Sequence, residues 1–374
     1  MWLQVVRGGS YDGGVSQSKQ VAIIGAGIAG ATAARELADA GAAVTVFDKS
    51  RGTGGRLAGR RFELPGLGKF TLAHGAPYFD ARSDDFQAQC EQWLDDGAVT
   101  KSPLISAKAD AGGKVTISDE RPTVYRGTPG MNEPVKRLLN QPAIKLVVNR
   151  QVTSVRPLDG GWQIGDETGP LGHRFDDVVL TCPVVQTRGL LQQAGEAGDE
   201  LVAALDGVAL EPRWSLLVVT SVGDPLAEAD FDEINFESGP IEKIVRGSQW
   251  VREAWTFHMS SPWSRQHLEL NADDAAERMR AEIQGQLRSQ MRLELSTMAG
   301  VEDALGGEML HASAHRWRYG KVSSALEKPC LSSYRSSRGT IGLCGDFCLG
   351  GRVEAAWASG RALGRQMAGS QNLE

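Results

Sequence analysis

Hydrophobic and polar positions near the start of the chain follow the pattern of a strand, a helix and a second strand. The segment VAIIGAGIAGATAARELADAGAAVTVFDK begins at Val21 with a short apolar run, which is followed by a glycine turn and an alanine-rich stretch. A second run of β-forming residues then leads to the acid Asp48. Short apolar runs between turn signals are typical of buried strands, and the longer stretch is typical of a helix. The pattern therefore predicts a βαβ unit.

The middle of the chain predicts further elements of the first sheet. VKRLL (135–139) has the spacing of a helix. IKLVVNRQVTSVRPL (144–158) and DDVVLTCPV (176–184) are rich in β-branched residues and predict strands that return to the first sheet. Between about Cys90 and Gly130 the pattern is weaker and indicates short strands and turns. The first domain is therefore expected to be discontinuous in the chain.

The next part of the chain predicts a second sheet. WSLLVVTSV (214–222), IEKIVRG (241–247), EAWTFHMS (253–260) and EMLHASAHRWRY (308–319) have strand character. NADDAAERMRAEIQGQLRSQM (271–291) predicts a helix of about six turns at 3.6 residues each. We expect these segments to form a separate antiparallel sheet with the helix covering one face.

The last part of the chain, GTIGLCGDFCLGGRVEAAWASGRALGRQM, predicts a strand, a glycine-rich turn and a closing helix. Apolar and small residues recur along that helix on one face, which should pack against the first sheet. These residues are Val353, Trp357, Gly360, Leu363, Gly364 and Met367.

The expected fold class is α/β, with a Rossmann-type nucleotide-binding domain and an inserted α+β substrate domain built on the antiparallel sheet. The glycine- and serine-rich residues 1–18 are expected to be a disordered leader. The expected division assigns 19–89, 131–200 and 330–374 to the nucleotide-binding domain, and 90–130 and 201–329 to the substrate domain.

Composition and charge narrow the classes of function. The chain has 374 residues, which is long enough for two average domains without disulfides or metals. Lys and Arg total 40 against 46 Asp and Glu, and no basic stripe is visible, so nucleic acid is not an expected partner. No apolar run reaches the length of about 18 residues that a membrane helix needs. The five cysteines include no CxxC pair, which favours a reduced cytoplasm and no metal site.

Gly25, Gly27 and Gly30 form a G-x-G-x-x-G fingerprint between the first strand and its helix. In such a fingerprint the first glycine makes the turn, the second admits a pyrophosphate and the third lets the helix meet the strand. Asp48 ends the second strand, where a carboxylate can accept hydrogen bonds from the adenosine ribose. The alternative is a packing turn with a solvated Asp48, but the combination favours a dinucleotide site.

A second glycine pair indicates which dinucleotide binds. Gly54, Gly55 and Arg56 place a cation near the pyrophosphate, which a nicotinamide dehydrogenase does not need. Gly345 and Asp346 end a strand near the C-terminus, so that Asp346 can accept a hydrogen bond from a ribityl chain. The closing helix, expected to start near residue 351, can direct its N-terminus at flavin N1 and the C2 carbonyl, where reduced flavin carries negative charge. These features predict FAD.

The chain resembles the FAD-dependent renalase-like oxidoreductases, within the wider amine oxidase group of flavoproteins that have the para-hydroxybenzoate hydroxylase type of fold. The resemblance runs from about Lys19 to Met367. The nucleotide motifs are shared by many flavoenzymes, whereas the others are specific when taken jointly and in order. The motifs are GAGIAG with DKSRGTGGR, then AHGAPYFDAR, RGTPGMNEPVKRL, AWTFHMSSPWSRQHLE, HRWRYG and CGDFCLGGRVEAAWASG.

The resemblance implies a noncovalent FAD and oxidation of misreduced nicotinamide dinucleotides, the 2- and 6-dihydro isomers of NAD(P), with oxygen as acceptor and hydrogen peroxide as product. Only one G-x-G-x-x-G is present, so a dinucleotide would enter as a substrate. The ring nitrogen of a dihydropyridine drives hydride departure, so no strong base is needed. The alternatives are a flavin amine oxidase, a desaturase of another small substrate, or a flavin-binding redox sensor without turnover. Oligomeric state and NAD or NADP preference stay undetermined.

The patterns and the resemblance together give two sets of candidate site residues. The catalytic candidates are His258, Trp317 and Tyr78. The cofactor-binding candidates are Gly25, Gly27, Ala29, Gly30, Asp48, Lys49, Gly54, Gly55, Arg56, His74, Gly75, Ala76, Val152, Gly345, Asp346, Arg352 and Val353.

Strand alternation orients the candidates of the second sheet. His258 should project to the same face as Thr256 and Ser260, where it would orient substrate, although a histidine bonded to a backbone carbonyl is the alternative. Trp317 should share a face with Tyr319, and Tyr78 is either a site residue or a core aromatic. Five tryptophans could line an aromatic slot for planar rings. They are Trp214, Trp250, Trp255, Trp263 and Trp317.

Overall fold

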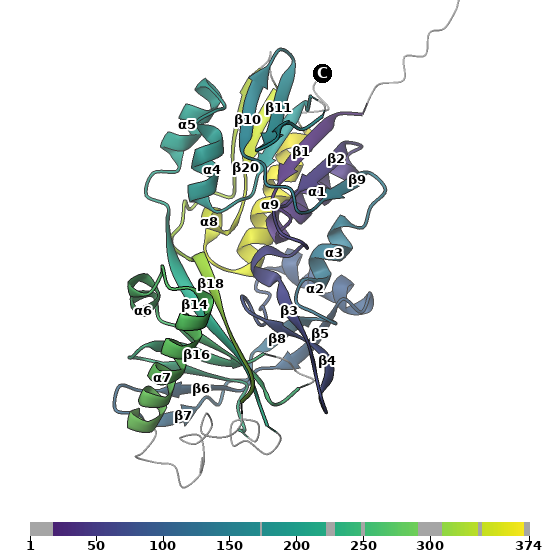
Figure 1. Cartoon of the computed structure of the whole chain (residues 1–374). Coiled ribbons are helices and arrows are strands. Elements are labelled where there is room, and N and C mark those ends of the chain that lie inside the picture. Colours follow the sequence, from purple (N-terminus) through teal and green to yellow (C-terminus); the bar gives the residue numbers. More distant parts are fainter. Residues whose placement is uncertain are drawn as a thin grey trace, which may run out of the picture.

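Two large β-sheets meet in the protein (Figure 1). The computed structural model describes residues 18–172, 174–221, 229–247, 251–290, 309–335 and 339–369. The expected leader falls outside these ranges except for Ser18, and Trp250 also falls outside them. Within these ranges no helix has the length and apolarity that a membrane crossing requires.

The first sheet has six strands and confirms the predicted βαβ unit. Helix α1 (Ile28–Asp39) connects β1 (Gln20–Ile24) to its parallel neighbour β2 (Ala43–Phe47), and only β19 (Leu331–Arg335) runs antiparallel. Val21 to Ile24 are all buried, as expected for a parallel strand that is covered on both faces. The order is β19 (Leu331–Arg335), β20 (Gly339–Leu343), β13 (Asp177–Leu180), β1 (Gln20–Ile24), β2 (Ala43–Phe47) and β9 (Ile144–Val147).

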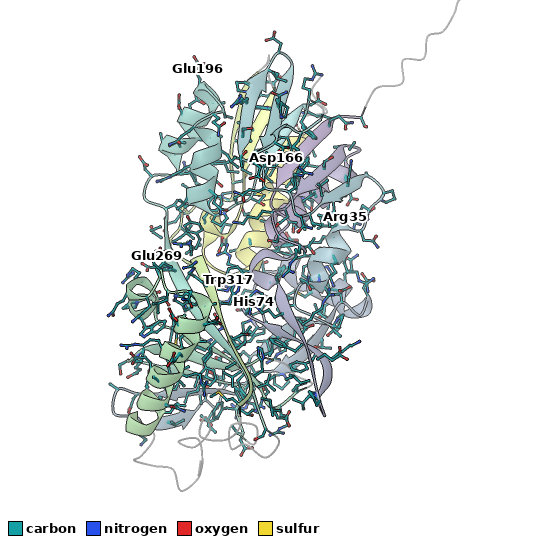
Figure 2. All side chains as sticks on the ribbon, in the orientation of Figure 1. Arg35, His74, Asp166, Glu196, Glu269 and Trp317 are labelled. Atoms are coloured by element: carbon teal, nitrogen blue, oxygen red, sulfur yellow. The ribbon has the colours of Figure 1, made fainter. Side chains whose placement is uncertain are left out.

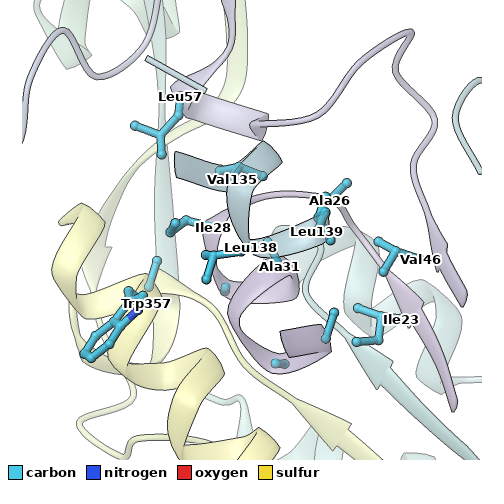
Figure 3. Close-up of a cluster of buried hydrophobic side chains, with 14 of the residues drawn as sticks. Ile23, Ala26, Ile28, Ala31, Val46, Leu57, Val135, Leu138, Leu139 and Trp357 are labelled. Carbon is cyan, nitrogen blue, oxygen red and sulfur yellow. The ribbon is translucent and has the colours of Figure 1, made fainter. Parts of the chain in front are cut away.

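Helices α1, α3 (Glu133–Leu139) and α9 (Val353–Gly369) share one hydrophobic core with one face of this sheet (Figure 3). The expectation that the closing helix packs on the sheet is incomplete, because α9 also crosses α1 closely. A Cβ on Gly360 would lie 2.2 Å from the Ala29 carbonyl oxygen, and one on Gly364 would lie 2.7 Å from the Glu36 Cβ. Two glycines therefore set the distance between these helices.

The other face of the parallel sheet is covered by a small antiparallel sheet and by helices α4 (Val184–Leu191) and α5 (Glu196–Ala204). The prediction that the whole segment 144–158 returns to the first sheet is wrong for its second half. Only β9 joins that sheet, as an edge strand. The second half pairs elsewhere because it covers the apolar face formed by Ala22 and Phe47. The small sheet consists of β10 (Ser154–Leu158), β11 (Gly161–Asp166) and β12 (Gly169–Pro170).

The second sheet has seven strands, with antiparallel neighbours except for the parallel pair β15 (Glu233–Phe236) and β6 (Ser106–Ala109). Helix α7 (Ala272–Gln290) packs on one face, as predicted, together with α6 (Ser261–Gln266). The order is β18 (Met309–Ser324), β14 (Ala209–Thr220), β17 (Ala254–Met259), β16 (Ile241–Arg246), β15 (Glu233–Phe236), β6 (Ser106–Ala109) and β7 (Val115–Ile117).

A hairpin joins the two sheets. Strands β3 (Gly59–Leu64) and β4 (Gly68–Ala73) place Leu72 in a cluster with Leu217 of the second sheet. A further pair, β5 (Val99–Pro103) and β8 (Thr123–Gly127), forms a separate two-stranded sheet. The hairpin thus brings the face of the second sheet that α7 leaves uncovered toward the first domain.

Two of the expected domain boundaries fall inside continuous helices. Position 90 lies in α2 (Asp84–Asp95), whose Cys90 and Trp93 pack in the same core as α1, while β6 and β7 from the same expected segment lie in the seven-stranded sheet. Position 200 lies in α5. A helix packs as one unit, so a domain boundary should lie before or after α2 and α5 and not inside them.

The glycine contact between α1 and α9 generates a stability prediction. Gly360→Ala should lower the thermal unfolding midpoint, because overpacking of about 1–3 kcal/mol exceeds the gain in helix propensity. Gly285→Ala in α7 is the matched control, since its Cβ would meet no atom within 4 Å. That variant should be stabilised by about 0.5–1 kcal/mol. A Gly360→Ala protein at least as stable as the wild type would contradict the close crossing.

Candidate active site

The first glycine turn combines two tightly packed glycines with an open one. A Cβ on Gly25 would lie 2.3 Å from Thr181 Oγ1, and φ at Gly25 is +116°. A Cβ on Gly30 would lie 2.0 Å from the Gly25 oxygen. Gly27, the residue before α1, differs because a Cβ there would meet no atom within 4 Å. The free amides of α1 therefore have open space beside them, as an anion site requires.

The second glycine turn lies against the first. The Gly54 amide donates to the Ala26 oxygen at 2.8 Å, and Gly54 forms a parallel bridge with Gly27. Gly54 has φ +117°, and Gly55 begins the short helix η1 (Gly55–Leu57). A Cβ on Gly55 would approach the Gly27 Cα to 3.5 Å. Two turns about 28 residues apart are therefore joined backbone to backbone.

Asp48 lies directly after β2 and is fixed beside the first turn. Its Oδ2 accepts from the Ala26 amide at 2.8 Å, and its Oδ1 accepts from the Ser50 amide at 2.7 Å. A carboxylate has further acceptor capacity on both oxygens, so these bonds leave room for ribose hydroxyls. Of the neighbouring candidates, Lys49 is exposed and Val152 is buried in the core on the far side of the parallel sheet.

Arg56 links the second turn to two distant segments. Its Nη2 donates to Asp346 Oδ1 at 2.6 Å, and its carbonyl oxygen accepts from the Ala76 amide at 3.0 Å. A Cβ on Gly75 would lie 2.1 Å from the same oxygen, so only glycine fits there. Arg56 thus brings together three groups of cofactor-binding candidates that are far apart in the sequence, at 54–56, 74–76 and 346.

The C-terminal turn differs in detail from the prediction. Asp346 begins a short helix, α8 (Asp346–Leu349), which the sequence did not predict, and α9 starts at Val353, two residues after the expected start. The Gly345 amide donates to Ser359 Oγ of α9 at 2.9 Å. Among the other candidates, Ala29 packs toward α9, and Arg352 is exposed with its guanidinium 3.8 Å from Glu354.

The buried His74 forms a ring cluster with the half-buried His315 and Trp317 where the hairpin meets the second sheet. Figure 2 shows His74 beside Trp317, and their ring centroids are 5.1 Å apart. The His74 and His315 centroids are 4.2 Å apart, and the Trp317 indole N–H donates to the His74 oxygen at 2.8 Å. Burial, with the charge of Arg60, lowers the pKa of His74 to about 4. Burial, with His74 and Arg60, lowers the pKa of His315 to about 3.

His258 lies on the same face of the second sheet as these rings. It pairs in register with Ser215, which pairs in turn with His315 on β18. The Ser215 hydroxyl and His258 Nδ1 are 2.9 Å apart, so the partner is a side chain and not the backbone carbonyl considered above. Burial lowers the pKa of His258 well below its usual value. Thr256 shares this face and donates to the Ala73 oxygen at 2.8 Å, whereas Ser260 caps α6.

Tyr78 belongs to a partly buried charge network. Its hydroxyl donates to Glu233 Oε2 at 2.6 Å, and the Lys243 ammonium donates to the same oxygen at 2.8 Å. Burial and the Glu233 charge raise the pKa of Tyr78. Burial opposes ionisation of Glu233, but the charge and hydrogen bond of Lys243, with the hydrogen bonds of Tyr78 and Asn235, lower the pKa of Glu233. Tyr78 therefore ties the segment after His74 to strands β15 and β16.

The predicted aromatic slot is wrong for three tryptophans. Trp214, Trp255 and Trp263 lie on the α7 side of the second sheet, in the core with that helix. Strand alternation puts Trp214 and Trp255 opposite His258, and Trp263 lies in α6 on that same side. Of the four slot tryptophans that the structure describes, Trp317 alone lies with the rings described above. Cys344 and Cys348 are free and fully buried.

Sequence reasoning missed several polar residues of this face. His315 was within reach, because it is two residues before Trp317 on one strand and alternation puts both on the same side. Glu233, Lys243 and Ser215 gave no such signal. Their importance depends on which strands are neighbours, and this order does not follow the order of the chain.

Comparison with known protein families identifies the class of protein to which this chain belongs. Residues 23–93, which contain both glycine turns, match the NAD(P)-binding Rossmann-like domain. Residues 73–367 match the family described as flavin containing amine oxidoreductase, which is well over half of the chain. The chain therefore belongs to the flavin-containing amine oxidoreductase family, and its cofactor is FAD. The paired glycine turns, the open space at Gly27 and the acid after β2 fit that cofactor.

Solved structures with the same fold include oxidases and oxidoreductases. Cyclohexylamine oxidase from Brevibacterium oxydans IH-35A has a TM-score of 0.67 at 12% identity, covering 95% of this chain and 100% of that chain. An oxidoreductase from Methanosarcina mazei has a TM-score of 0.61 at 12% identity, covering 92% of this chain and 99% of that chain. At this identity the likeness shows the fold alone.

One curated relative is more similar in sequence over a shorter stretch. The tRNA 5-methylaminomethyl-2-thiouridine biosynthesis bifunctional protein of Thiobacillus denitrificans is 27% identical over 208 residues. The match covers 47% of this chain and 34% of that protein. The chain therefore matches only about a third of the length of this relative.

The open space at Gly27 generates the first site prediction. Gly27→Val should fold, because the protein has no atom within 4 Å of the new Cβ and the change at the helix start costs about 1 kcal/mol. It should lose FAD, because the side chain occupies the space of the pyrophosphate. Circular dichroism and the flavin absorbance of the purified protein measure the two effects. Gly30→Val, whose Cβ would clash with the Gly25 oxygen, should instead destabilise the fold. A Gly27→Val protein with full flavin would contradict the assignment.

The ion pair between Arg56 and Asp346 generates the second site prediction, which concerns the retention of FAD. Asp346→Ala should weaken FAD retention by about 1.5–3 kcal/mol, because it removes a charged hydrogen-bond acceptor and releases Arg56. The isosteric Asp346→Asn should show the same direction with the fold intact. Asp80→Ala, which breaks the more exposed pair with Arg82, is the control and should leave the dissociation constant of FAD unchanged. Equal FAD affinity in Asp346→Asn and wild type would make Asp346 a turn residue only.

Proposed function

We propose that the FAD-loaded protein oxidises a dihydronicotinamide dinucleotide, namely the 2- and 6-dihydro isomers of NAD(P), in a renalase-like reaction. One observation carries this proposal. Three histidines lie where the segment 74–76 meets the face of the second sheet that α7 leaves uncovered: His74 beside the sheet, and His258 and His315 on it. Burial lowers the pKa of each of them. His311, further along β18 on the same face, has a pKa that burial also lowers. Neutral imidazoles of such low basicity are poor acceptors of a proton at neutral pH.

A dihydropyridine suits this environment because its ring nitrogen supplies the electrons for hydride departure. No side chain has to remove a proton, so most of the rate enhancement comes from positioning the substrate ring. Bound FAD supplies the acceptor of the hydride, and oxygen takes the two electrons onward to give hydrogen peroxide. The indole of Trp317 and the ring of His74 provide planar surfaces for a planar substrate.

Within this proposal the chain's own residues position the substrate. His258 orients it through a hydrogen bond and is itself held by Ser215. Trp317 forms one wall and fastens the segment 74–76 through its indole N–H. Tyr78, bonded to Glu233, keeps the same segment against the second sheet. A cytoplasmic location belongs to the same proposal, since all five cysteines are unpaired.

A flavin amine oxidase is the second candidate. The family match from 73 to 367 includes the seven-stranded sheet, and neutral surroundings also suit an amine bound as the free base. The two candidates differ in their dependence on pH, because an amine has to lose a proton before it is oxidised. A non-catalytic redox sensor is excluded if any of these substrates supports oxygen consumption.

The proposal predicts the pH profile of flavin reduction. With a dihydronicotinamide, the rate of anaerobic flavin bleaching should be nearly flat from about pH 6 to 9, because the lowered pKa values leave all three histidines neutral throughout that range. Stopped-flow absorbance at fixed substrate measures the rate. A steep rise with pH that tracks an amine pKa, and no bleaching by any dihydronicotinamide, would favour the amine oxidase instead.

His258→Ala tests the positioning role. It should slow flavin reduction about tenfold, the worth of one hydrogen bond of about 1.4 kcal/mol, without abolishing it and without changing the pH profile. His267→Ala removes a histidine that stacks on Trp263 on the α7 side of the sheet, and it should leave the rate unchanged. Complete loss of reduction in His258→Ala, with FAD still bound, would contradict a base-free mechanism.

A further inference from the structure

A cleft of about 590 Å³ lies beside α3, away from the residues assigned to the cofactor. We call it the α3 cleft. Its walls come from the loop after β2, from β3, from α3 and from the end of β9. The residues that matter here are Arg51, Arg61, Lys136, Arg137, Leu146 and Val148. A volume of this size is within the range of small-molecule sites, about 300–1,000 Å³.

The cleft is strongly cationic in a chain whose formal net charge is −6. Four basic side chains line it, against one carboxylate, Glu133, which is 2.8 Å from the Lys136 ammonium and 3.6 Å from the Arg137 guanidinium. Arg51 and Arg61 have no ion pair or side-chain hydrogen bond within the described part of the chain. Two guanidiniums are therefore available to an anion, and a planar fork suits a phosphate.

An apolar wall faces part of the same cleft. Leu146 is 41% exposed, which is unusual for a large aliphatic residue on a strand of the parallel sheet, and Val148 follows two positions later. An inorganic anion has no apolar group that could be buried against this wall. A ligand with a phosphate at one end and a ring or other apolar group at the other would use both walls.

The α3 cleft is separate from the glycine turns. None of Gly27, Asp48, Arg56 and His74 lines it. The two sites are on different parts of one loop, since Arg51 to Thr53 line the cleft and Gly54 contacts the first turn. Asn132 fastens this loop to the start of α3 by donating to the Thr53 oxygen at 3.0 Å.

We propose that the α3 cleft binds an organic phosphate of nucleotide size, with its phosphate on Arg51 and Arg61 and its apolar part on Leu146 and Val148. The site would be occupied while FAD is bound. This proposal goes beyond the oxidation reaction and does not depend on it.

Calorimetric titration of the FAD-loaded protein with adenosine 5′-monophosphate tests the proposal, with inorganic pyrophosphate as a second probe. Both should bind, and the affinity should fall with salt. Arg61→Gln and Arg51→Gln should each weaken both probes about tenfold or more, the loss expected for a charged hydrogen bond. Leu146→Ser should weaken adenosine monophosphate and leave pyrophosphate unchanged. Arg156→Gln, at an exposed arginine of β10, is the matched control and should change neither.

Flavin absorbance keeps the two sites distinguishable, because all four variants should retain FAD. No binding of either probe at millimolar concentration would overturn the proposal, and so would an equal loss in Arg156→Gln. Binding only to the FAD-free protein, with displacement by FAD, would also overturn it, since the cleft would then be part of the cofactor site. Failure of dihydronicotinamide oxidation would leave this outcome untouched.

Discussion

The backbone contact between the two glycine turns is the constraint on which the rest of the structure depends. Gly27 and Gly54 pair as adjacent strands do, and the Gly54 amide bonds to the Ala26 oxygen. A side chain at Gly54 would collide with Asn132 at a φ of +117°, and one at Gly27 would fill the space before α1. From this contact, Arg56 reaches Asp346 at the C-terminal turn, and its carbonyl holds Ala76. The N-terminal, middle and C-terminal parts of the chain therefore meet around one short segment.

The second sheet is attached to the same place by hydrogen bonds to backbone carbonyls. Thr256 donates to the Ala73 oxygen and Trp317 to the His74 oxygen, on consecutive residues of the segment that packs on Arg56. Burial of this junction removes water from His74, His258 and His315 and lowers their pKa values. The attachment of the two domains and the low basicity of these histidines thus have one physical cause, the removal of water from the junction.

Local patterns predicted the elements whose signals are local. The βαβ unit, the fingerprint glycines, Asp48 and the α7 helix follow from periodicity and turn residues within a few dozen positions. Features set by strand order were not predictable in this way. The β10 segment looked like a member of the first sheet because apolar spacing does not say which sheet a strand joins. The contact between Tyr78 and Glu233 and the burial of Trp255 against α7 likewise depend on neighbours distant in the sequence.

The central claim is that the joined glycine turns hold one FAD per chain. The most direct measurement begins by incubating the purified protein with equal concentrations of FAD and FMN. Unbound flavin is then removed, the protein is denatured, and the released flavin is identified by chromatography and mass. The account predicts one FAD for each chain, because Asp48 and the open N-terminus of α1 serve the adenosine and pyrophosphate that FMN lacks. Release of FMN, or a protein that takes up no flavin, would contradict it.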